Sequence, residues 1–151
     1  MPVRWTSSPS ILADLAVHWA YLQGAWAEAQ AAPLSRRKAL LVAALVDSYA
    51  DRLFAGQDAP GDILVFRSDL AARSAPLALV FGLVARLDAV VPVTEFVAVP
   101  LETYGQLRVE DFMVSLYNGN SIQRQFLALP NGERLDLLET LALAIADLGA
   151  D

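Results

Sequence analysis

The chain lacks cysteine altogether and contains a single histidine, His18. Without cysteine, the sequence excludes a disulfide scaffold and every cysteine-ligated metal site. One histidine also excludes multi-histidine metal sites and the HExxH zinc motif. The eight glycines are scattered singly, so neither a Walker A loop nor a GxGxxG loop is present. We therefore expect no metal and no cofactor, and we find no catalytic motif.

Lysine is almost as scarce, because the basic residues are ten arginines and one lysine. This skew, together with abundant alanine, is typical of GC-rich coding and favours a bacterial source. The net charge is −6, and residues 76–151 carry all of it, with four basic and ten acidic groups. Because acidic surfaces repel phosphate backbones, we expect no nucleic-acid binding. The exception would be binding by the cluster Arg36-Arg37-Lys38 alone.

Long uninterrupted hydrophobic runs are missing, although 56% of the residues are hydrophobic. The most apolar run contains Arg86 and Asp88, and Pro76 and Pro92 leave only 15 residues between them. A membrane-spanning helix needs about 20 apolar residues. The first residues also show no apolar signal region. We therefore expect no membrane span and a soluble, cytoplasmic protein.

Alanine and leucine are plentiful, with 26 and 25 copies, and both favour helices. A first helix is expected to begin at Pro9, with Ser8 as its N-cap, and to end near Ala32. A second helix is expected to start after Ser35 and to run to Ala55. The connection is short, which predicts an antiparallel helical hairpin. The predicted apolar stripes are Leu12, Leu15, Trp19, Leu22 and Trp26 on the first helix, and Leu41, Leu45, Tyr49 and Leu53, with Val42 and Val46 beside them, on the second.

The remainder of the chain is expected to mix helices with short strands. The predicted elements are a short helix from Asp62 to Arg73, a central buried helix from Ser74 to about Val90 that includes Val84, a strand over Val93–Val99, a helix around Val109–Leu116 and a final helix from about Leu135 to Leu148. Residues Ile122 to Leu129 fit a strand or a helix. We favour a strand, because the turn signal Pro130-Asn131-Gly132 follows. The predicted fold is mainly α (α+β): one compact domain over residues 1–151, with five to six helices and two or three short strands in the C-terminal half.

Tryptophan is concentrated in the first quarter of the chain, at Trp5, Trp19 and Trp26. Trp19 and Trp26 are one heptad apart and so share a helix face. They could form a ligand wall or a protein-binding hot spot, since tryptophan is enriched in both. The plainer interpretation is that these bulky side chains fill the space between the two helices of the hairpin.

His18 and Tyr21 lie beside Trp19 in the sequence. His18 could act as a lone base in a pocket with Trp19 and Tyr21, but a packed or surface histidine is the more common case. The segment from Asn118 to Arg124, with Asn118, Asn120 and Arg124, is rich in hydrogen-bonding side chains. Such loops often carry binding sites, although asparagine and glycine also occur in turns for their backbone freedom.

Asp47 and Asp51 are four residues apart on the second predicted helix. Together they could contribute oxygen ligands to a hard cation, but such a site needs further carboxylates that the sequence does not supply. The simpler interpretation is that both carboxylates face solvent.

The balance of these features favours a non-enzymatic interaction or oligomerising module. Apolar residues exceed what an average small monomer carries, and surplus apolar surface is commonly buried between subunits or against a partner. We expect a homo-oligomer or a protein partner. The alternative is a small-molecule-binding protein or a metal-independent enzyme, with its pocket near Trp19, Tyr21 and His18 or in the loop from Asn118 to Arg124.

Overall fold

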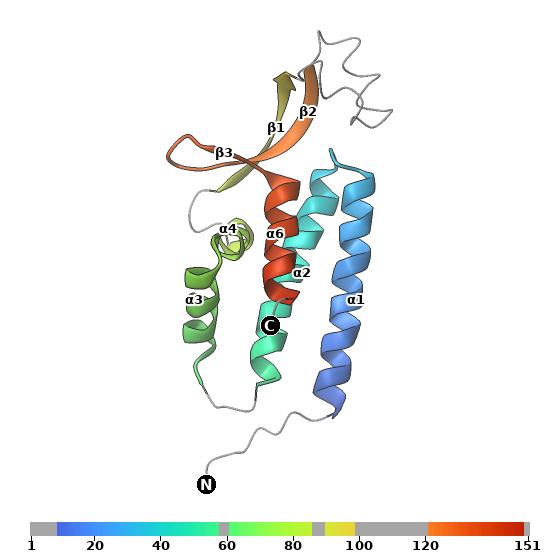
Figure 1. Ribbon diagram of the computed structural model, residues 1–151, viewed down its shortest axis with the longest axis vertical. Helices are drawn as coiled ribbons and strands as arrows, with labels where there is room; N and C mark the ends of the chain where they lie inside the picture. The colour runs from blue at the N-terminus through green and yellow to red at the C-terminus, as the bar shows by residue number, and fades with distance from the viewer. Residues whose placement is uncertain (1–8, 58–60, 86–89, 99–120, 150–151) are drawn as a thin grey trace.

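The computed structural model describes residues 9–57, 61–85, 90–98 and 121–149. These residues form five helices and three strands (Figure 1). The elements are α1 (Pro9–Ala31), α2 (Arg36–Ala55), α3 (Ile63–Arg73), α4 (Ala75–Ala85), β1 (Val91–Ala98), β2 (Ser121–Ala128), β3 (Arg134–Asp136) and α6 (Leu137–Gly149). The predicted mainly α fold, a single compact domain with a small sheet in its C-terminal half, is confirmed. The helix predicted around Val109–Leu116, together with Trp5, Asn118 and Asn120, falls outside the described residues.

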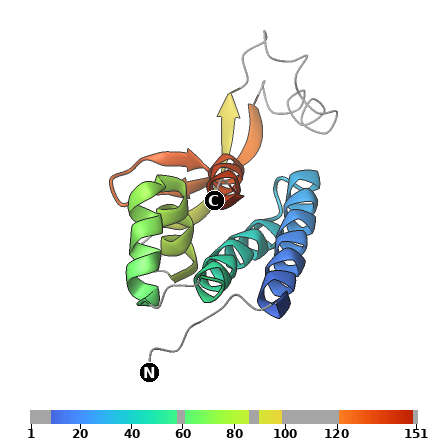
Figure 2. The same cartoon turned by 60° about the horizontal axis from the view of Figure 1, so that its bottom comes forward.

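Helices α1 and α2 form the predicted antiparallel hairpin and lie side by side in both views (Figures 1 and 2). Ser35 is the N-cap of α2, and its hydroxyl accepts a hydrogen bond from the Lys38 backbone N–H at 3.3 Å. On α1, Leu22 is fully buried and Trp26 packs against the core. Leu12 is exposed instead of buried. The last residues of α6 reach only the level of Trp19, so α6 does not cover the first turns of α1.

Helix α2 is the central helix, because it packs against α1, α3, α4 and α6. Its buried side consists of small residues, namely Ala39, Val42, Ala43, Val46 and Ala50. The face of larger residues that the sequence predicted to be buried is therefore not the buried face of α2. Leu41 is exposed, and Leu45, Tyr49 and Leu53 are only partly buried. Small side chains let several helices approach α2 at once, which a leucine face would not allow.

The sequence predicted that the helix starting near Ser74 would be the central buried helix, but α2 takes that place and α4 is buried on one side. Its Leu77, Val80, Gly82 and Leu83 are buried, but Val84 is exposed. Ser74 lies just before the helix, and its Oγ accepts a hydrogen bond from the Leu77 N–H at 3.2 Å. The same hydroxyl donates to Asp147 Oδ2 at 2.5 Å, which ties the start of α4 to α6. Helix α6 packs against both α2 and α4 and lies near the middle of the molecule in Figures 1 and 2.

The three strands form an antiparallel sheet in the order β1-β2-β3, at one end of the helices (Figure 1). The segment that could be strand or helix is thus strand β2. The predicted turn joins β2 to β3, and Gly132 takes φ 89° there, a conformation that favours glycine. Leu135 belongs to β3, so the final helix starts at Leu137. Asp136 caps it by accepting a hydrogen bond from the Glu139 N–H at 2.8 Å.

Of the helices in the described part of the chain, none combines the length and the hydropathy needed to cross a membrane. The sheet and the helices meet at Gln125, which is buried on β2. Its Nε2 donates to the Pro33 carbonyl oxygen at 2.8 Å, in the connection between α1 and α2. This bond ties β2 to the same end of the helical hairpin at which α2 begins.

Candidate functional site: an apolar groove

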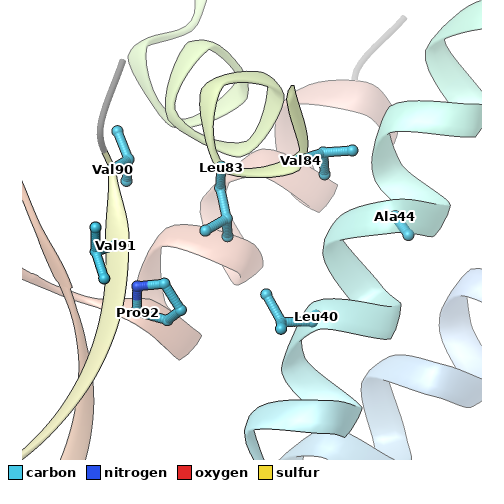
Figure 3. A pocket seen from close by; sticks show the side chains of 7 residues that line it. All are labelled: Leu40, Ala44, Leu83, Val84, Val90, Val91 and Pro92. Carbon is cyan, nitrogen blue, oxygen red and sulfur yellow. The ribbon is translucent and has the colours of Figure 1, made fainter. Parts of the chain in front are cut away.

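A groove of about 490 Å³ opens between α2, the end of α4 and the start of β1 (Figure 3). Its described lining residues are all apolar: Leu40 and Ala44 from α2, Leu83 and Val84 from α4, and Val90, Val91 and Pro92 at the start of β1. In the close view, Leu40, Leu83 and Pro92 point into the same space from three different elements. Tertiary packing alone creates this surface, because its residues span positions 40 to 92 of the chain.

The local sequence explains why these residues line a groove and not the core. Leu40 and Ala44 are four residues apart, so they share a face of α2, away from the fully buried Val42 and Val46. Pro92 lies on an outer strand of the sheet, which suits a residue that cannot donate a backbone hydrogen bond. Val90 and Val91 are neighbours at the start of the strand, and only Val90 is buried.

The groove leaves large hydrophobic side chains open to solvent. Leu40 is 37% exposed, Val84 39% and Val91 50%. Contiguous exposed apolar surface on a soluble protein commonly marks an interaction site. Small-molecule sites normally add a few convergent polar groups to an apolar lining, and no side chain named in this lining is polar. The groove can therefore bury apolar side chains, and its described lining residues offer no side chain that could act as an acid, base or nucleophile.

The tryptophans proposed from the sequence as a binding wall instead pack within the helical layer. The Trp19 ring centre lies 5.2 Å from that of Tyr49 on α2. A side chain on Gly149 of α6 would come within 3.1 Å of the Trp19 ring, so α6 also approaches it closely. Burial raises the pKa of Tyr49 above its usual value. Trp26 packs against the same core, and neither tryptophan lines the groove.

His18 and Tyr21 lie on the outer part of α1, in edge-to-face contact with ring centres 5.4 Å apart. His18 Nε2 is 3.4 Å from Asp14 Oδ1, and the other oxygen of Asp14 accepts a hydrogen bond from Arg52 Nη1 at 2.6 Å. This chain of contacts connects α1 to α2. The structure brings His18, Trp19 and Tyr21 onto neighbouring turns of one helix but not into the groove.

The candidate loop from Asn118 to Arg124 is only partly described. Asn118 and Asn120 fall outside the described residues, whereas Arg124 lies within strand β2 and not in a loop. Its Nη1 donates to the Gln123 carbonyl oxygen at 3.0 Å, and its register partner on β1 is Glu95. Arg124 does not line the groove either.

Asp47 and Asp51 are engaged by Arg67 of α3. Arg67 forms ion pairs with both carboxylates, at 2.8 Å to Asp51 Oδ1, and also donates to the Asp47 carbonyl oxygen at 3.2 Å. Burial lowers the pKa of Arg67, but its bonds to Asp47 and Asp51 more than offset this, so the pKa lies above the usual value. In the part of the chain that is described, no group of three or more potential metal ligands gathers.

The groove was not identified from the sequence. The adjacent leucines Leu40 and Leu41 give no local signal for it, because adjacent helix residues such as Val42 and Ala43 can both be buried. Comparison with known proteins adds no further guide, because no family model, curated protein or solved structure matches the chain.

Proposed function

We propose that this protein is a non-enzymatic interaction module that binds an apolar segment of a protein partner in the groove between α2, α4 and β1. One observation carries the proposal: the seven described lining residues are apolar, and Leu40, Val84 and Val91 are exposed. Burying such side chains against a partner is favourable by about 25 cal/mol for each Å² removed from water. A peptide segment supplies apolar side chains in the numbers that such a groove can hold.

A different protein is favoured over a second copy as the occupant. The basic cluster Arg36-Arg37-Lys38 begins the helix that forms one wall of the groove, and the described lining residues of a second copy include no acidic side chain with which it could pair. Complementary charges across an interface favour a specific partner. Homo-oligomerisation through another surface stays a prediction, and sedimentation velocity on the full chain tests it.

The test is selection from a phage-displayed library of random peptides about 16 residues long, enough for a strand or about four helical turns. Enriched peptides are synthesised with a fluorescent label, and their Kd values are measured by anisotropy against the full chain. Leu40→Glu and Val84→Glu each place a charge in the groove and should raise Kd about tenfold or more, equivalent to about 1.4 kcal/mol.

Leu64→Glu is the matched control, because Leu64 is 72% exposed on α3 and lies outside the groove lining. It should leave Kd within about twofold of the wild-type value, well under about 1 kcal/mol. Circular dichroism confirms that each variant keeps its helices. The proposal fails if no peptide is enriched, or if Leu40→Glu and Val84→Glu bind the enriched peptides as tightly as Leu64→Glu does.

A further inference from the structure

A cluster of basic side chains stands at one end of the groove. Arg36, Arg37 and Lys38 are the first three residues of α2. Arg36 and Arg37 precede the groove residue Leu40 by four and three positions, so they lie one turn before it on the same side of the helix. Positive charge therefore lies one helical turn from the groove residue Leu40.

This cluster has no neutralising partner among the described residues. The ion pairs among the described residues engage His18, Arg52, Arg67 and Arg134, and none of them includes Arg36, Arg37 or Lys38. Arg36 and Arg37 are exposed. The amino end of α2 adds partial positive charge at the same place, because the helix dipole points that way. In a chain of net charge −6, this is a local reversal of sign.

We infer that the segment bound in the groove is amphipathic and acidic at one end. Its apolar side chains occupy the groove, and its aspartate or glutamate side chains pair with Arg36 and Arg37. This inference rests on the proposed function and adds a direction to it, because charged pairs at one end fix which way the segment runs. Arginine suits this role, since its planar guanidinium can hold a carboxylate through two hydrogen bonds.

An acidic peptide fits this surface better than a nucleic acid does. Nucleic-acid grooves for single strands place aromatic side chains where bases can stack, and the described residues of the groove lining are leucine, alanine, valine and proline. Apolar side chains that carry carboxylates beside them match this lining better than stacked bases do.

The experiment starts from one groove-binding peptide of the selection described above, made in three versions. One carries glutamates at its amino end, one carries them at its carboxyl end, and one carries glutamines at both. At low salt, one glutamate version should bind about tenfold more tightly than the glutamine version, and the other should gain little. The advantage should shrink at 1 M salt, where charges are screened within about 3 Å.

Charge-reversal variants of the protein test whether the gain in affinity of the glutamate peptide depends on Arg36 and Arg37. Arg36→Glu and Arg37→Glu should each raise the Kd of the favoured glutamate peptide about tenfold at low salt, and leave the Kd of the glutamine peptide unchanged within about twofold. Arg73→Glu is the matched control, because Arg73 is an exposed arginine at the end of α3 and makes the same change in net charge. It should shift the Kd of either peptide less than about twofold.

The outcomes separate this inference from the proposed function. If Arg36→Glu and Arg37→Glu behave like Arg73→Glu while Leu40→Glu still abolishes binding, the inference is overturned and the groove remains a binding site. If Leu40→Glu has no effect either, both proposals fail.

A labelled single-stranded oligonucleotide serves as the second probe. Binding that is lost in Arg37→Glu but kept in Leu40→Glu would overturn the inference in favour of nucleic acid.

Discussion

At the scale of single residues, Arg67 joins three helices. From α3 it reaches Asp47 and Asp51 on α2, and its guanidinium carbon lies 4.3 Å above the centre of the Phe81 ring on α4. The two aspartates are four residues apart and would repel each other without it. Solvent exposure was the favoured sequence interpretation of this pair of carboxylates, and a hard cation the less favoured one. In the structure, both carboxylates pair with Arg67 of the same chain.

Removing the Arg67 charge should therefore destabilise the fold. Arg67→Met leaves Asp47 and Asp51 facing each other without a cation, and we expect the free energy of unfolding to fall by about 1–3 kcal/mol. Arg134→Met breaks the ion pair with Glu95, in which both side chains are more than 40% exposed, and should cost less than about 1 kcal/mol. Urea unfolding followed by circular dichroism measures both changes. Equal losses in the two variants would mean that the Arg67 cluster is only a surface ion pair.

At the scale of elements, α1 is held by contacts that converge on Trp19. The ring meets Tyr49 of α2 and approaches Gly149 at the end of α6, so one side chain connects three helices. This packing accounts for tryptophan at position 19 without any ligand. The groove lies elsewhere, where α2, α4 and β1 diverge.

Truncating Trp19 should thus act on stability. Trp19→Ala removes contacts to two other helices, and we expect it to cost about 3 kcal/mol in the free energy of unfolding. Tyr21→Ala, on the exposed side of the same helix, should cost about 0.5 kcal/mol or less. Peptide binding in the groove should be the same in Tyr21→Ala and in wild type. A folded Trp19→Ala protein of wild-type stability would refute the packing role.

At the scale of the whole molecule, the helices and sheet share one hydrophobic core. Buried residues from every helix join a single cluster that also includes Leu127 of β2. A domain built this way should unfold in one cooperative step. The tryptophans offer a direct check, because all three lie within the first 26 residues.

We therefore expect tryptophan fluorescence, which reports on the start of the chain, and far-UV circular dichroism, which reports on all helices, to give the same urea midpoint. Coincidence of the two curves is the standard evidence for two-state unfolding. A fluorescence midpoint well below the dichroism midpoint would show that α1 separates from the rest before the core unfolds.

Features that depend on neighbouring residues were predictable from the sequence. Ser35 caps α2 and Asp62 caps α3, because their short polar side chains accept hydrogen bonds from backbone N–H groups three and two residues further along. The turn at Gly132 follows from its backbone freedom. The helical hairpin follows from the short connection after α1. In each case the decisive contacts lie within a few residues of one another.

Features that depend on several elements at once were decided only by tertiary structure. A predicted buried face is assigned from the spacing of the large apolar side chains. The sequence therefore could not show that α2 buries its alanines and exposes Leu41. The pairing of β1 with β2 crosses residues 99–120, and no local signal sets its register. The groove combines residues 40, 44, 83, 84 and 90–92, which meet only because α4 and β1 pack beside α2. Burial of any apolar side chain is favourable, so the hydrophobic effect alone does not select which ones are buried. Only the packing of the elements determines which apolar residues stay exposed.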